Sequence, residues 1–168
     1  MRCALLAALL APSLSSVAAS AARAQDAPGA SMPDEATIPS GYEFHGELAT
    51  RDGQGRMVEK LYVHDGKESE LRVIAVIAES ARAARSVCDM AGERLRDHDF
   101  DVRAAMMDGR PGIVAERRMG LSYERAAFVT SGAACLGVRI SGEEDRPPVR
   151  SEVPILVAMV ARGHADVD

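Results

Sequence analysis

The chain has 168 residues, of which 47% are hydrophobic and 27% charged, and its formal net charge is −5. This composition is typical of a single globular domain and argues against collagen-like, low-complexity and disordered classes. The acidic balance argues against a basic nucleic-acid-binding protein. The scarcity of aromatic residues (4%, with no tryptophan) argues against a surface that stacks bases or sugars.

The N-terminus has the pattern of a secretory signal peptide. Arg2 is followed by an apolar stretch over residues 3–11, and Ala22-Arg23-Ala24 supplies the small residues of an A-x-A cleavage site. We expect residues 1–24 to be removed, with the cut between Ala24 and Gln25. A membrane anchor is the alternative, but the apolar run is shorter than the roughly 20 residues that a span needs. The mature chain is therefore expected in the periplasm or outside the cell, without a transmembrane segment.

Two cysteines remain after the predicted cleavage, because Cys3 lies within the signal peptide. Cys88 and Cys135 are a disulfide candidate, since an oxidising compartment favours pairing of an isolated pair. Two buried, inert thiols are the alternative. Cys88 falls on the apolar stripe of a predicted helix, together with Ala81, Ala84, Ala91 and Leu95, so we expect it to face the core.

The rest of the chain divides into a tether, a domain and a short tail. Prolines and glycines interrupt residues 25–40, which predicts a flexible N-terminal tether. Residues 41–163 are expected to form a single domain, and residues 164–168 a frayed tail.

Hydrophobic periodicity predicts the elements of the domain. In chain order they are strands over 42–48, 57–64 and 71–78, a helix over 81–97 capped by Ser80, strands over 101–107, 113–118, 123–130 and 135–141, and a helix from Ser151 to Gly163. Short connections between strands favour antiparallel neighbours. The expected fold class is α+β, with an antiparallel sheet of about six to seven strands sandwiched by two α-helices.

From Ser80 to Gly163 the expected order is helix, strand, the turn Asp108-Gly109-Arg110-Pro111, long antiparallel strands and a closing helix. This order resembles the C-terminal part of the Mog1/PsbP-like fold. The resemblance implies a sheet sandwiched by helices and a non-enzymatic role. Among its members, PsbP-like and DcrB-like periplasmic accessory proteins fit the predicted signal peptide best. DcrB-type proteins are typically lipid-anchored, whereas this chain has no cysteine at the cleavage site.

Motifs for nucleophilic catalysis, phosphate binding, dinucleotide binding and zinc binding are absent from the sequence, so no catalytic, cofactor or metal residue is predicted. The densest group of possible metal ligands, Asp97-His98-Asp99 with Asp101, is expected to be a solvated polar turn. Arg117, Arg118 and Arg125 are a candidate interaction patch on neighbouring strands. The alternative is cross-strand pairing of these arginines with Glu116 and Glu124.

These observations favour an exported, non-enzymatic periplasmic accessory or binding protein whose partner is another protein or a small ligand, and not a nucleic acid. Two alternatives stay open. One is a secreted inhibitor of another enzyme, which would insert an exposed loop into an active site. The other is a small periplasmic enzyme whose site is assembled only in three dimensions.

Overall fold

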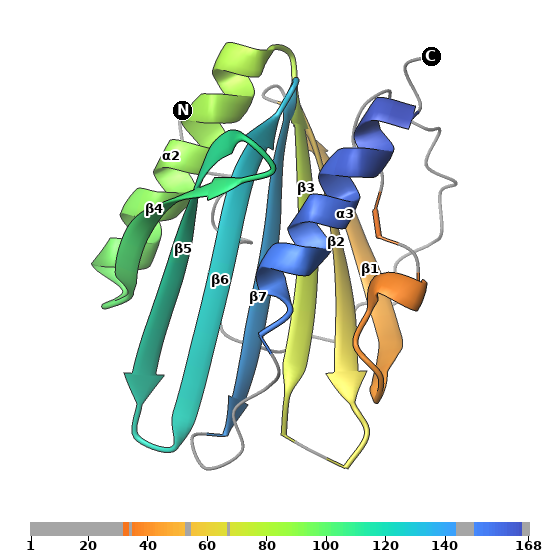
Figure 1. The fold of residues 1–168 in the computed structure, drawn as a ribbon, viewed down its shortest axis with the longest axis vertical. Coiled ribbons are helices and arrows are strands. Elements are labelled where there is room, and N and C mark those ends of the chain that lie inside the picture. Colours follow the sequence, from red (N-terminus) through yellow and green to blue (C-terminus); the bar gives the residue numbers. More distant parts are fainter. Residues whose placement is uncertain (1–31, 34, 53–54, 67, 144–149, 166–168) are drawn as a thin grey trace.

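A computed structural model of the chain describes residues 32–33, 35–52, 55–66, 68–143 and 150–165. They form a seven-stranded antiparallel sheet, and the described part also contains two α-helices and one 3-10 turn (Figure 1). The α+β class is therefore confirmed. In chain order the elements are η1 (Glu35–Thr37), β1 (Tyr42–Asp52), β2 (Gly55–His64), β3 (Glu70–Ala78), α2 (Ala81–Asp97), β4 (Asp101–Met107), β5 (Arg110–Met119), β6 (Ser122–Ser131), β7 (Ala134–Glu143) and α3 (Glu152–Ala165).

The strand order in the sheet is β1-β2-β3-β7-β6-β5-β4. The chain builds one half as a meander from β1 to β3, crosses through α2 to the far edge, and returns strand by strand until β7 pairs with β3. Two-residue turns set much of this register. At the β4–β5 turn, Asp108 and Gly109 have φ of 50° and 72°, the left-handed values that a type I′ hairpin requires. Met107 therefore pairs with Arg110, and Asp101 with Glu116.

Helix α2 begins and ends where the sequence predicts. The Ser80 side chain accepts a hydrogen bond from the amide of Ala83, which satisfies one of the free N–H groups of the first turn. Its buried stripe differs from the expected one, because Val87 and Gly92 are buried whereas Ala81, at the first position of the helix, is exposed. Cys88 lies at the edge of this stripe and is packed against the core.

The hydrophobic core forms two clusters, one with each helix. The first contains side chains of α3, including Ile155 and Leu156, packed on Val73 of β3. The second contains side chains of α2, including Leu95, packed on Ile74 of the same strand. Successive strand residues point to opposite faces of a sheet, so the two clusters, and with them the two helices, lie on opposite faces. Figure 1 shows α3 crossing the near face.

Several strands are a few residues longer than expected, and the segments before β1 and at the end of α3 also differ from the sequence-based expectation. In the part of the predicted tether that is described, residues 35–37 form η1, which contacts α3, and the apolar side chains of Met32 and Ile38 pack against the core cluster that contains α3. Helix α3 continues past Gly163 to Ala165. A glycine lowers helix stability by about 1 kcal/mol but does not by itself end a helix. The predicted signal peptide, its cleavage site and Cys3 lie outside the described residues.

Candidate functional site

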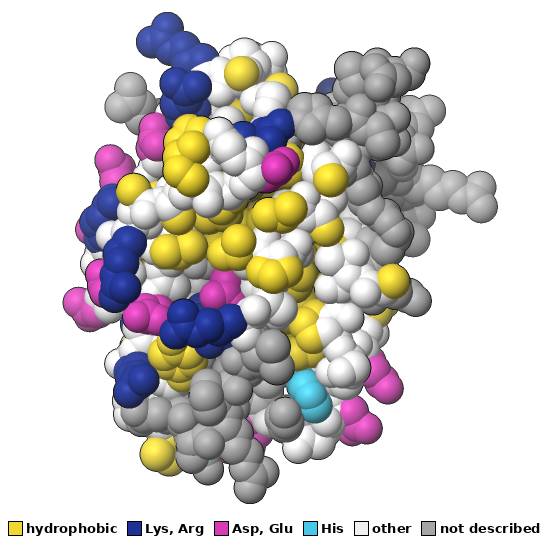
Figure 2. All heavy atoms as spheres, in the orientation of Figure 1, with side chains coloured by type: hydrophobic (Ala, Val, Ile, Leu, Met, Phe, Trp, Pro, Cys, Tyr) yellow, Lys and Arg dark blue, Asp and Glu magenta, His cyan; other side chains and the backbone are white. Residues whose placement is uncertain are grey.

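A cleft of about 300 Å³ lies where α3 begins, beside the edge of the sheet that carries β4. Strands β4, β5 and β6 form one wall, and the first turn of α3 forms the other. We call it the α3 cleft; its lining residues are Asp101, Arg103, Val114, Ala115, Glu116, Arg125, Arg150, Glu152, Val153 and Pro154. Figure 2 shows acidic and basic side chains beside apolar ones on this face of the molecule.

Cross-strand pairing places the charged strand residues that line the cleft on the face that α3 covers. Asp101 pairs with Glu116, and Glu116 pairs with Arg125, so these three side chains project from neighbouring strands in one row. Arg103 pairs with Val114 one step further along β4. Residues directly opposite on antiparallel strands share a face. The hairpin turns therefore assemble this wall, and α3 closes it.

Charges of opposite sign are interleaved around the exposed rim of the cleft. Arg103 forms ion pairs with Asp101 and, at 3.4 Å, with Glu116 Oε1. Glu116 Oε2 accepts a hydrogen bond of 2.8 Å from the hydroxyl of Tyr123. Arg150 lies 4.0 Å from that same oxygen, longer than a hydrogen bond, and its side chain is 75% exposed. Arg150 thus presents its guanidinium mainly to solvent.

A buried ion pair forms the inner end of the cleft. Arg125 Nε lies 3.2 Å from Glu152 Oε1, and the two residues are only 4% and 8% exposed. The Arg125 guanidinium also lies over the ring of Tyr123, 5.3 Å from its centre. The second carboxylate oxygen, Glu152 Oε2, is buried and has no hydrogen-bond partner among the described residues. Glu152 therefore lines the cleft and carries a buried acceptor oxygen that the described part of the chain does not use.

The predicted arginine patch is divided between the two faces of the sheet. Arg118 and Arg125 lie on the α3 face, and both guanidinium groups approach the ring of Tyr123. Arg117 lies on the α2 face, where it pairs with Glu124 at 2.8 Å, the cross-strand pairing considered as the alternative. Arg125 pairs with Glu152 of α3, while its cross-strand neighbour is Glu116. Of the three arginines, only Arg125 lines the α3 cleft.

The Arg117–Glu124 pair belongs to a compact network on the α2 face. Glu124 also receives the guanidinium of Arg139, while Arg117 donates a hydrogen bond of 2.9 Å to the carbonyl of His98 and lies 4.5 Å from the ring centre of Phe100. Burial raises the pKa of Glu124, but the adjacent Arg139 and Arg117 more than offset this, so its pKa lies below the ordinary value. These contacts fasten the end of α2 to the sheet.

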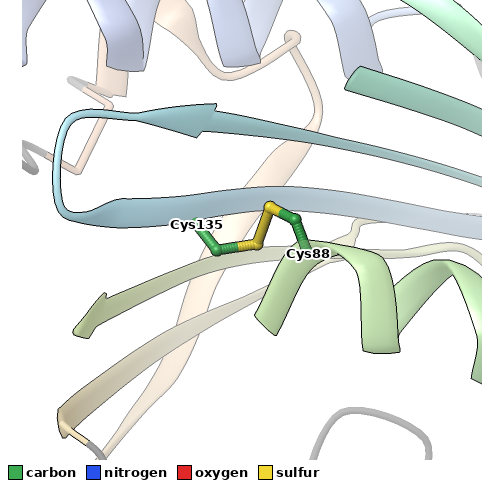
Figure 3. The surroundings of a disulfide bond; sticks show 2 residues. All are labelled: Cys88 and Cys135. Carbon is green, nitrogen blue, oxygen red and sulfur yellow. A yellow bond between two sulfur atoms is a disulfide. The ribbon is translucent and has the colours of Figure 1, made fainter. Parts of the chain in front are cut away.

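The disulfide candidate is a bond in the structure. Cys88 of α2 and Cys135 of β7 are joined across the second core cluster, with their Cα atoms 5.6 Å apart (Figure 3). Neither sulfur is therefore available as a thiolate nucleophile or metal ligand. In the described ranges, no group of three or more His, Cys, Asp or Glu side chains is placed to hold a metal ion. No helix there is long and apolar enough to cross a membrane.

Sequence reasoning did not identify Asp101, Arg103, Arg150 or Glu152 as site residues. A partial signal was present, because the two-residue turns before β5 and β6 fix which charged residues face each other. The docking of α3 onto these strands had no local signal. Glu152 follows the predicted cap Ser151, a position where an acidic residue is favoured by the helix dipole alone.

Comparison with known proteins gives little further information. The chain matches no family model and no curated protein. Among solved structures, it is similar to the extracellular domain of PknH from Mycobacterium tuberculosis, with a TM-score of 0.48 and 8% sequence identity, over 75% of this chain and 86% of that chain. At this level of similarity, the function has to be inferred from the geometry of the site.

Proposed function

We propose that the protein is an exported, non-enzymatic binding protein and that the α3 cleft is its ligand site. The observation that carries the proposal is Glu152, which lines the cleft and whose buried acceptor Oε2 has no donor among the described residues. Buried polar atoms nearly always have partners, and an unmet one costs about 1–3 kcal/mol. A ligand that donates a hydrogen bond at this point would remove that cost.

The chemistry of the cleft wall supports recognition of a small polar ligand. Arginines and carboxylates alternate along the rim, and Val114, Val153 and Pro154 add apolar surface. A few convergent polar groups on an otherwise apolar concave surface are typical of ligand sites, which span roughly 300–1,000 Å³. The α3 cleft is therefore of the size expected for a small molecule.

Two observations support export. The N-terminal sequence has the pattern of a signal peptide, and the domain contains a disulfide between Cys88 and Cys135. Disulfides persist in the periplasm and outside the cell but are rare in reducing compartments. We therefore place the mature protein in the periplasm or the extracellular medium.

We also retain the Mog1/PsbP-like resemblance as part of the proposal, with its sandwich of a sheet between helices and its link to periplasmic accessory proteins. Its support is the order of elements: α2, β4, the Asp108-Gly109 turn, the long antiparallel strands β5 to β7, and the closing helix α3. A shared fold would not by itself transfer a ligand. The ligand has to be found at the cleft.

The binding proposal can be tested without knowing the ligand. The isotopically labelled protein, recovered from the periplasm of a Gram-negative host without reductant, is mixed with a low-molecular-weight extract of the culture, and amide NMR spectra are recorded. We expect the amide signals of Arg103, Glu116 and residues 150–153 to move. Pro154→Trp, which fills the cleft at an exposed lining position, should abolish these changes, whereas the matched Leu121→Trp, whose site is 84% exposed and outside the cleft, should preserve them.

Unchanged spectra, or equal changes in the Pro154→Trp protein, would contradict the proposal. The mass of the denatured protein provides a separate test of export. We expect a chain that begins at Gln25 and lacks the two hydrogens of the Cys88 and Cys135 thiols. An unprocessed N-terminus would refute the export part of the proposal while leaving the ligand site unaffected.

A further inference from the structure

The α3 cleft presents three different chemistries at three separate places. Its inner end has a buried acceptor, Glu152 Oε2. Its rim has an exposed cation, Arg150, whose nearest carboxylate among the described residues, that of Glu116, is 4.0 Å away. Its walls have apolar side chains from β5 and from the first turn of α3. A ligand that satisfies all three must carry a positive donor, a negative acceptor and an apolar group within a short distance.

The inner end favours a cationic donor. Glu152 is about nine-tenths buried, and its first oxygen already faces the guanidinium of Arg125. The second oxygen needs a hydrogen-bond donor, and a hydrogen bond to a charged group contributes about 1.5–3 kcal/mol, more than a neutral one. Glu116 adds a second negative charge to the same wall and is occupied only in part, by Tyr123 and Arg103. A cationic ligand group, such as an ammonium, would be attracted to these two carboxylates on the lining of the cleft.

The rim favours a carboxylate. The side chain of Arg150 is 75% exposed, so its planar fork of N–H donors can turn towards a ligand. Arg103 faces the same rim from β4 but is held by Asp101 and Glu116, whereas the one ion pair of Arg150 among the described residues is 4.0 Å long, so we assign the carboxylate to Arg150. An arginine fork binds a carboxylate through two parallel hydrogen bonds. The positive end of the α3 dipole adds to the attraction at this end of the helix.

We propose that the α3 cleft binds a free α-amino acid with an apolar side chain. This inference rests on the proposed function and names the class of ligand. The ammonium group binds Glu152, the carboxylate binds Arg150, and the side chain packs against Val114, Val153 and Pro154. The volume of about 300 Å³, at the lower limit for ligand sites, favours a single amino acid over a longer peptide.

The test uses L-leucine and two analogues that each lack one charge. L-leucinamide has the ammonium group without the carboxylate, and N-acetyl-L-leucine has the carboxylate without the ammonium group. Each is titrated into the full mature protein, and the amide NMR signals of the cleft are followed. Loss of a charged hydrogen bond corresponds to a weakening of about tenfold or more. We expect L-leucine to bind at least about tenfold more tightly than either analogue.

Two variants identify the carboxylate partner. Arg150→Gln should weaken L-leucine about tenfold and leave L-leucinamide unchanged, because only the carboxylate contact is lost. Arg82→Gln, an exposed arginine on α2 at the opposite face, makes the same change in charge and should have no effect. Arg150 is exposed, so its replacement should not disturb folding, in contrast to replacement of the buried Glu152.

Equal binding of L-leucine and either analogue would overturn the inference, and so would Arg150→Gln with wild-type affinity. The extract experiment separates this failure from failure of the proposed function. If the culture extract moves the cleft signals and L-leucine does not, the cleft is a ligand site for another class of molecule. If neither moves them, both proposals are wrong.

Discussion

Reduction of the Cys88–Cys135 disulfide is expected to lower the free energy of unfolding by about 4 kcal/mol. The bond joins residues separated by 47 positions, and in the chain-entropy model a loop of this length restricts the unfolded ensemble by about that amount at 25 °C. Typical domains are stable by only about 5–15 kcal/mol, so the loss would be a large part of the total. The reduced protein should nevertheless stay folded in buffer, because Val87, Ala91 and Leu95 keep α2 packed on the sheet.

Urea unfolding followed by far-ultraviolet circular dichroism measures this loss, since the chain has no tryptophan to serve as a fluorescent reporter. The oxidised and reduced wild-type proteins are compared in the same buffer. A Cys88→Ala/Cys135→Ala variant is the control, because its stability should be low and should not respond to reductant. A difference in the free energy of unfolding of less than about 1 kcal/mol between oxidised and reduced protein would refute the reasoning, because the crosslink would then not reduce the conformational entropy of the unfolded chain.

The remaining predictions concern the α2 face of the sheet. Gly137→Ala should destabilise the fold by about 1–3 kcal/mol, because the new Cβ would lie 2.3 Å from Cε1 of Phe128, whereas Gly46→Ala, with nothing within 4 Å, should be nearly neutral in the same urea experiment. Equal effects of the two variants would contradict this packing. The pKa of Glu124 is lower in the folded protein than in the unfolded chain, so its ionised carboxylate stabilises the fold. This contribution is fully present at pH values above the unfolded pKa of about 4.3 and is lost as the pH falls through the folded pKa. The difference in the free energy of unfolding between wild type and Glu124→Gln should therefore become smaller below about pH 4.3. A difference that stays constant down to the acid-unfolding transition would show that Arg139 does not stabilise the ionised form of Glu124.

Local pattern was sufficient to predict most of the secondary structure, whereas Arg125 was the one lining residue of the cleft that the sequence analysis named as a candidate interaction residue. The limits of α2 follow from Ser80 and from the spacing of its apolar residues, and the Asp108-Gly109 turn fixes the register of β4 against β5. The alternation of side chains along a strand also requires the adjacent Arg117 and Arg118 to point to opposite faces of the sheet. This alternation by itself divides the predicted arginine patch between the two faces.

The parts that could not be predicted depend on contacts between segments far apart in the chain. Glu152 and Arg125 meet because α3 packs on the β6–β7 half of the sheet, and no local signal specifies that docking. The disulfide likewise needed the placement of α2 against β7, since the sequence left bonded cysteines and free thiols equally open.

The central claim is that the α3 cleft holds an amino acid in one defined orientation. The most direct measurement is the set of nuclear Overhauser effects between L-leucine and the protein at a saturating ligand concentration. We predict contacts from the leucine methyl groups to the methyl groups of Val114 and Val153. Contacts to exposed apolar residues elsewhere, such as Phe44 or Leu121, or no intermolecular contact at all, would contradict the account.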